Sequence, residues 1–258
     1  MSSPPHIRLD DPRSTLLRAA IAEFAERGEA GARTDAIARA AGVNKALLHY
    51  YFGTKQALYA AALDTILAGL KEHYLGLLAG PGSAGHRILR YVRANFDRMA
   101  SSRDYARVLG HEMMRARSGA SASLPHMAQA YFGPLHAQVC ATLAEGIRSG
   151  EFRALDPAQT ALTLTGANVF YFIAAPVLAE VADRDPREPD MLRLRRAAIL
   201  DHAAALLFED RAAGQAMARA LLEAPPDLPP DIHEGGLPAR LVHPPAGSRP
   251  SRATASEP

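Results

Sequence analysis

The chain has 258 residues, of which 48% are apolar, 22% charged and 6% aromatic, a composition typical of globular proteins rather than disordered or fibrous ones. The formal net charge is only +2, so a surface that binds a polyanion has to be local. A single cysteine, Cys140, excludes an intrachain disulfide framework and four-cysteine zinc sites. Its apolar neighbours indicate a small buried side chain rather than a reactive thiol.

The sequence shows neither a signal peptide nor a membrane-spanning stretch. The first residues hold no apolar run of the kind found in signal peptides. The longest apolar stretch, 169–179, contains Pro176 and is far shorter than the ~20 residues that span a bilayer. We therefore expect a cytoplasmic protein.

Apolar residues recur at helical spacing between residue 12 and about residue 223, after a polar arm over 1–11. This region lacks sustained alternation of period two and the Asn-Gly or Asp-Gly turns of hairpins. The pattern predicts an all-α fold. The expected helices are 12–27, 34–41, 45–51, 55–79, 84–100, 103–117, 126–149, 158–182 and 190–222.

Several helix ends are marked by capping residues. Asp11 followed by Pro12 is typical of a helix start, and Gly28 of its end. Gly214 is a point at which the last helix can break. Beyond it, 224–258 holds nine of the 19 prolines, which predicts a disordered or extended tail, with a proline-rich ligand for a partner domain as the alternative.

The most informative stretch is 34–59, TDAIARAAGVNKALLHYYFGTKQALY. Thr34 is placed to cap a short helix, Gly42 permits a tight turn, and Asn44 is placed to cap the next helix. Ala38 is small enough for two helices to approach, and Leu48 with Tyr51 faces back towards the first helix. These are the requirements of a helix-turn-helix, with 12–27 as the third helix of the bundle.

The outward positions of the second helix form a candidate DNA-contacting face. Leu47 is expected to lie on the exposed surface, where its apolar group can meet a thymine methyl. Between residues 33 and 55 the charges are Arg33, Arg39, Lys45 and Lys55 against Asp35, a local +3 in a nearly neutral chain. The amides and lysine at Thr54-Lys55 are also placed to bind a phosphate.

The block AIARAAGVNKALLHYYFGTKQALY resembles the signature of the tetracycline-repressor (TetR) family of bacterial regulators, IA..AGVSKGTLYHYF.SKE.L. The resemblance covers roughly 13–60, with weaker support from GEFRALDP over 150–157. Gly, Thr, Tyr and His are commoner in the family where this chain has Ala46, Leu47, His49 and Tyr50. The matching residues are Ile37, Ala38, Ala41, Gly42, Val43, Lys45, Leu48, Tyr51, Phe52, Lys55 and Leu58.

The resemblance implies a homodimeric DNA-binding regulator, most simply a repressor, with a head over 12–54 and a helical ligand-binding and dimerisation domain over 55–223. A small molecule in that domain would move the helix over 55–79 and release a palindromic operator. The expected DNA-binding residues are Arg33, Thr34, Asn44, Lys45, Ala46, Leu47, His49, Tyr50 and Lys55.

Large apolar and amphipathic side chains on the middle helices are candidates for the effector pocket, although each fits an ordinary core equally well. Arg107, His111 and Arg115 recur at intervals of four and form a cationic stripe, which either holds an acidic effector or faces solvent. Phe96, Met113, Tyr131, Tyr171 and Phe172 belong to the wider set. The expected ligand-binding residues are Tyr91, Met99, Arg107, His111, Met114, Phe132, His136 and Phe170.

Dimer contacts are expected from 158–182 and 190–210, where small residues permit close helix approach beside Phe170, Leu178, Leu194 and Leu206. No pattern for a metal, a nucleotide cofactor or a catalytic nucleophile is present, so neither a cofactor nor enzymatic activity is expected. Two alternatives remain: a helical small-molecule-binding protein without DNA binding, and an all-α hydrolase or lyase. The sequence identifies neither the effector nor the operator.

Overall fold

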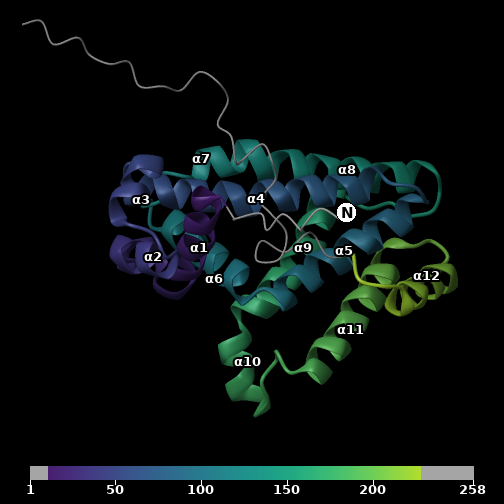
Figure 1. Cartoon of the computed structure of the whole chain (residues 1–258). Helices are drawn as coiled ribbons and strands as arrows, with labels where there is room; N and C mark the ends of the chain where they lie inside the picture. The colour runs from purple at the N-terminus through teal and green to yellow at the C-terminus, as the bar shows by residue number, and fades with distance from the viewer. Residues whose placement is uncertain (1–10, 228–258) are drawn as a thin grey trace, which may run out of the picture.

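The computed structural model describes residues 11–227. Within that range every regular element is a helix, and the one extended contact is an isolated antiparallel bridge between Phe152 and Phe208. Figure 1 shows the helices α1, α2 and α3 grouped at one end of a longer helical bundle. The predicted all-α fold is confirmed.

The head consists of α1 (Pro12–Gly31), α2 (Thr34–Ala40) and α3 (Lys45–Phe52). Asp11 caps α1 through the Arg13 amide, and Gly28 (φ +63°) interrupts the helix where the sequence predicted its end, before one further turn. The expectation that Thr34 caps α2 is wrong. Thr34 is the first helical residue, and Arg33 occupies the cap position without a side-chain hydrogen bond.

The helix α4 (Lys55–Ala79) leads from the head into the bundle and packs on α1, α5 and α8. Thr54 caps it, its hydroxyl accepting from the Ala57 amide at 3.1 Å. It is followed by α5 (Ala84–Ser101), the central helix of the bundle, and by α6 (Arg103–Arg117), which packs across α1.

The predicted helix 126–149 divides into α7 (Leu124–Met127), a π-helical turn η1 (Ala128–Phe132) and α8 (Gly133–Arg148). Pro134 explains the change in geometry. It has no N–H to donate to the Ala130 carbonyl four residues earlier, so the α-helical ladder cannot continue there. The Lys71 ammonium of α4 donates to that carbonyl instead, at 3.1 Å.

The predicted single helix 158–182 is also wrong. The chain forms α9 (Pro157–Ile173) and α10 (Ala175–Ala182), bent by 67°. Pro176 lies two residues into α10, where its ring would clash with the Phe172 carbonyl of a continuous helix. Within the described residues no single helix is long and apolar enough to cross a membrane. Taken together, the bent pair of α9 and α10 reaches that length and composition.

The last predicted helix breaks before Gly214. The structure has α11 (Pro189–Leu207) and α12 (Arg211–Glu223), and Asp210 caps the second through the Ala212 and Ala213 amides. Gly214 lies inside α12, and the Phe208 ring fills the space where a side chain at this position would lie. A Cβ at Gly214 would lie 2.6 Å from that ring.

The bundle is built around α5, which buries several charged side chains as well as apolar ones. Asp97 is paired with Arg93 of the same helix at 3.4 Å and with Arg196 of α11 at 2.5 Å. Asn168 of α9 donates to the Val92 carbonyl at 2.9 Å. Buried charges need partners, so these contacts define where α9 and α11 pack on α5.

Of the tail predicted over 224–258, the structure describes only the first four residues. Residues 224–227 lie on the bundle: Arg93 donates to the Ala224 carbonyl at 2.7 Å, and Arg90 binds both carboxylate oxygens of Asp227 at 2.8 and 2.9 Å. The His73 ring contacts the Asp227 carbonyl at 3.0 Å. Residues 228–258, and the polar arm over 1–10, lie outside the described residues.

These contacts predict a difference between two truncations. A chain ending at Ala224 should melt about 2–4 °C below one ending at Asp227, since it loses a partly exposed bidentate ion pair worth about 1 kcal/mol. Differential scanning calorimetry measures this, and Asp227→Asn in the full chain is the matched control for the charge alone.

The same pair has a pH signature. The Arg90 guanidinium lowers the pKa of Asp227 below its ordinary 3.8, so the pair stabilises the fold above that value. This stability is lost as pH falls through the lowered pKa. Equal melting temperatures for the two truncations at neutral pH would show that Asp227 contributes nothing.

Candidate functional site

The helix-turn-helix predicted over 34–52 is present. Gly42 (φ +67°) makes the turn, and the Val43 amide donates to the Ala38 carbonyl at 3.0 Å. Asn44 caps α3, its side chain accepting from the Ala46 amide at 2.8 Å. Ile37, Ala38 and Leu48 are buried against α1. The local sequence thus determines both the turn and the face that α3 buries.

The opposite face of α3 is open to solvent. Tyr50 is 81% exposed and packs edge-on against Tyr51, at 5.4 Å between ring centres. Thr34 and Leu47 are half-buried, so the protein covers part of the Leu47 side chain that was expected on the outward face. The other exposed residues of the expected DNA-binding set are Arg33, Asn44, Lys45, Ala46 and His49.

Two of these exposed groups are already oriented by partners in the protein. The Lys45 ammonium lies 2.8 Å from the Asp35 carboxylate of α2, and this contact lowers the pKa of Asp35. The Nδ1 of His49 lies 2.9 Å from the Gly53 carbonyl, so a neutral imidazole donates there and leaves Nε2 as an acceptor.

Lys55 has a different environment from the one expected. Its ammonium donates to the carbonyls of Ala30 and Ala32, at 3.1 and 3.2 Å. These carbonyls lie at the end of α1, where helix geometry leaves them without amide partners. Lys55 therefore joins the start of α4 to the end of α1, and two of its three donors are used within the protein.

A buried carboxylate joins α4 to α6. Glu112 is 1% exposed and accepts hydrogen bonds from Tyr59 of α4, at 2.7 Å, and from Ser121. Arg115 lies 3.5 Å from the same carboxylate and stacks over the Tyr59 ring. Burial and the Glu112 hydrogen bond raise the pKa of Tyr59, so its hydroxyl remains a donor.

The cationic stripe of α6 faces the head. Arg107 pairs with Glu26 of α1 at 2.6 Å, Arg115 pairs with Glu29, and the His111 ring packs against the backbone of Gly28. The stripe was expected either to hold an acidic effector or to face solvent. In the structure, Arg107 and Arg115 form ion pairs between α6 and the last turns of α1.

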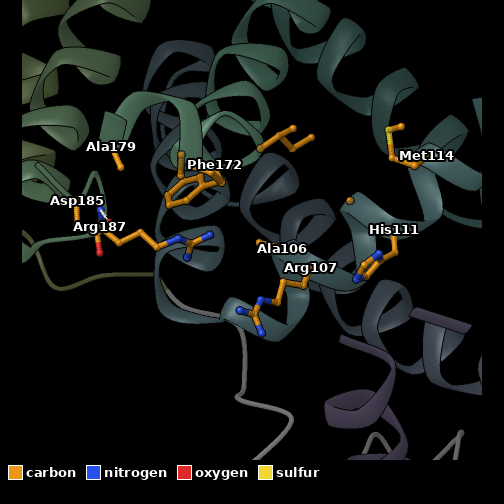
Figure 2. Close-up of a pocket in the computed structure, with 12 residues that line it drawn as sticks. Ala106, Arg107, His111, Met114, Phe172, Ala179, Asp185 and Arg187 are labelled. Carbon is orange, nitrogen blue, oxygen red and sulfur yellow. Dashed lines mark hydrogen bonds between the residues drawn. The ribbon is translucent and has the colours of Figure 1, made fainter. Parts of the chain in front are cut away.

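Three expected ligand-binding residues, Arg107, His111 and Met114, line an open groove of about 560 Å³ between α6 and the bend from α9 to α10. We call this the elbow groove; Figure 2 shows these side chains of α6 facing Phe172 and Arg187 across it. The Arg187 guanidinium lies 5.4 Å from the Phe172 ring centre.

A second hollow lies among the helices of the bundle. Its outer pocket has a volume of about 590 Å³ and contains the expected residues Tyr91, Phe132 and His136. Its walls come from α5, α6, η1, α8 and α9 and are mainly apolar. They include Leu109, Met113, Leu135, Val139, Leu162 and Val169.

An inner chamber of about 80 Å³ adjoins the outer pocket, and Tyr91, Leu109, Phe132, Leu135, Thr165 and Val169 line both. It reaches α4 through Leu67, Leu70, Lys71 and Tyr74. Tyr91 and Thr165 contact each other through their hydroxyls at 3.1 Å. Burial raises the pKa of Tyr91 and raises that of Tyr105 to about 12, so these phenols are neutral at physiological pH.

Two expected ligand-binding residues lie elsewhere. Met99 is 1% exposed in the core and lines neither hollow, and Phe170 is 68% exposed on α9. Sequence reasoning missed Lys71 and Tyr74, because the helical pattern of α4 was read only as a connecting helix. A usable signal was present: Lys71 is the last lysine of the chain and follows an apolar stretch.

Family models match both parts of the chain. Residues 16–62 match the model of bacterial regulatory proteins of the TetR family, and residues 86–202 match a tetracyclin repressor-like C-terminal domain. The first range covers the helix-turn-helix, and the second covers the helices around the outer pocket.

Two curated relatives are 30% identical to the chain. They are the HTH-type transcriptional regulator RutR of Escherichia coli K12, over 186 residues (68% of this chain, 81% of the relative), and the HTH-type transcriptional repressor SCO4008 of Streptomyces coelicolor, over 174 residues (66% and 84%).

Solved structures share the fold. The ketosteroid transcriptional regulator KstR2 of Mycobacterium tuberculosis superposes with a TM-score of 0.62 at 18% identity, covering 79% of this chain and 98% of that one. AibR, in complex with isovaleryl coenzyme A and operator DNA, superposes with a TM-score of 0.54 at 18% identity (63% and 86%). With both family models and relatives matched over more than four fifths of their length in agreement, the chain belongs to the TetR family of DNA-binding transcriptional regulators.

Proposed function

We propose that this regulator is a cytoplasmic repressor without enzymatic activity. It binds an inverted-repeat operator as a homodimer and leaves it when a small molecule enters the outer pocket. The exposed face of α3 is the observation that supports DNA binding. Its start is capped by Asn44, Lys45 provides a cation there, and the Tyr50 ring is exposed to solvent. We place the head over 12–54 and the regulatory domain over 55–223.

On DNA, α3 would lie in the major groove. Asn44 and Lys45 at its start, and Arg33 beside it, are placed for phosphate contacts, and Ala46, Leu47, His49 and Tyr50 for base edges or the sugar-phosphate backbone. Thr34 would contribute its hydroxyl from the start of α2. Lys55 would act mainly through its hydrogen bonds to the end of α1, which hold α4 against the head.

The proposed dimer surface follows the exposed apolar side chains of α9, α10 and α11. Phe170, Val177 and Val181 are 65–79% exposed, although apolar side chains of this size are more often covered. They follow one another along the α9–α10 bend, and Leu162, Ile173 and Leu194 extend the set. A two-fold contact through this surface would pair two heads for one operator.

Effector binding would reach the head through α4. Phe132 lines both hollows, and the adjoining Tyr131 donates to Asp64 of α4 at 3.0 Å. His126 lies 2.9 Å from the same carboxylate. A ligand that displaces η1 would therefore pull on α4. The operator is released only if the effector binds the displaced state more tightly.

Selection of bound DNA from a random pool tests the whole proposal. We expect an inverted repeat whose half-sites place the two α3 helices about 34–36 Å apart, or a multiple of it. Tyr50→Ala should relax the preference equally in both half-sites, by about 1–3 kcal/mol in total, and leave binding to random DNA unchanged. Selected sites without an inverted repeat would contradict the dimeric operator complex.

Lys45 and Asp35 make a matched pair of tests. Lys45→Ala should weaken DNA binding and flatten its dependence on log salt by about one unit, because one phosphate contact is lost. Asp35→Asn should tighten binding, because it frees Lys45 and removes a negative charge near the phosphates. Fluorescence anisotropy over a salt series measures both, and an unchanged slope in Lys45→Ala would remove this lysine from the interface.

Charged substitutions test the dimer surface. Val177→Glu and Val181→Glu should convert dimers into monomers at micromolar concentration and weaken operator binding, while exposed positions leave folding intact. Sedimentation velocity measures the change. Leu124→Glu, at an exposed apolar position on α7, is the matched control and should leave the dimer unchanged; monomers in all three variants, or in none, would contradict the proposed surface.

A further inference from the structure

The inner chamber is rich in hydrogen-bond donors. Tyr74 lines it at 2% exposure, and the buried hydroxyl of Tyr74 makes no hydrogen bond of regular geometry, with Asn95 or any other described residue. Tyr91, Tyr105 and Tyr131 add three further phenols; the hydroxyl of Tyr131 donates to Asp64, and that of Tyr91 contacts Thr165. An unsatisfied buried hydroxyl costs free energy, so a molecule that accepts a hydrogen bond from Tyr74 would be stabilised there.

The charge around the chamber is positive and uncompensated. Lys71 lines it, with its ammonium 5.4 Å from the Tyr131 ring centre. Arg98, 4% exposed, lies one layer outside and stacks on the Tyr105 ring at 5.5 Å. Among the described residues neither cation has a carboxylate within ion-pair distance, and none of the residues that line the two hollows is acidic.

The outer pocket supplies the opposite chemistry. Apart from His136, which contacts the Cys140 sulfur at 3.5 Å, and the Tyr91–Thr165 pair, its side chains are apolar. A ligand that fills both hollows therefore meets cations and phenols at the inner end and aliphatic and aromatic surface along the rest. The complementary molecule carries an acidic head on an apolar body.

We propose that the effector is an amphipathic carboxylate, whose head enters the inner chamber between Lys71 and Tyr74 and whose apolar body fills the outer pocket. This rests on the proposed function and specifies its ligand. A buried carboxylate needs a cation and hydrogen-bond donors, and these two residues of α4 supply one of each.

The position of Lys71 gives the acid a direct effect on α4. The ammonium now donates to the Ala130 carbonyl, the group whose α-helical partner would be the missing N–H of Pro134. A carboxylate that takes up Lys71 competes with this bond and loosens α4 from η1. A neutral ligand of the same shape fills the outer pocket but leaves the bond in place.

The test uses the full chain and a series of n-alkanoates, hexanoate to dodecanoate, each compared with its n-alkanol. Isothermal titration calorimetry should give the best acid a dissociation constant at least about tenfold below that of its alcohol. Lys71→Gln should abolish this difference, and Tyr74→Phe should reduce it. Arg219→Gln, which removes a cation from the exposed face of α12, is the charge-matched control and should change neither affinity.

We also expect the acid, and not the alcohol, to release the selected operator. Equal affinity for acid and alcohol, acid binding that survives Lys71→Gln but is lost in His136→Ala, or no acid binding at all would overturn the proposal. So would acid binding that leaves the operator complex intact. In each case an inverted repeat from the random pool would show that the regulator function itself stands.

Discussion

The arrangement of the head on the bundle depends on the burial of one carboxylate, Glu112. A buried charge is tolerated only where hydrogen bonds and a countercharge surround it. Tyr59 of α4, Ser121 and Arg115 meet that need, and Tyr59 packs edge-on against Phe24 of α1 at 4.9 Å. These contacts therefore fix the positions of α1, α4 and α6 relative to one another. Because α3 packs on α1 and α4, they also determine which face of α3 is exposed.

A second set of contacts attaches α4 to the ligand-binding side of the bundle. Asp64 and Lys71 of α4 contact η1 and the end of α7, whereas Tyr59 and Lys55 contact the head. Hence one helix carries both sets of polar contacts. This arrangement is what the proposed effector response requires, since a ligand in the inner chamber touches α4 directly.

Buried charges organise the rest of the bundle in the same manner. Arg93, Asp97 and Arg196 form a connected group between α5 and α11, and Arg93 also reaches the chain that follows α12. Asp227 then pairs with Arg90 on the neighbouring turn of α5. Residues 224–227, which follow the predicted end of the helical region at 223, are thus held by α5, the central helix of the bundle.

Local sequence was sufficient wherever the physical cause is local. The helix starts at Asp11, Asn44 and Thr54 follow from side chains that cap nearby amides, and the helix-turn-helix follows from Gly42 and the spacing of its apolar residues. The family resemblance and the all-α fold rest on the same short-range pattern.

Tertiary structure decided what depends on distant partners. Lys55 donates to the carbonyls of Ala30 and Ala32 at the end of α1, 25 and 23 residues away in sequence. The stripe of Arg107, His111 and Arg115 contacts α1. The last predicted helix breaks at Phe208, whose ring fills the space beside Gly214. The inner chamber brings Lys71 and Tyr74 of α4 together with Tyr91 of α5 and Tyr105 of α6. Spacing along a helix tells which residues share a face, but only packing determines what that face meets.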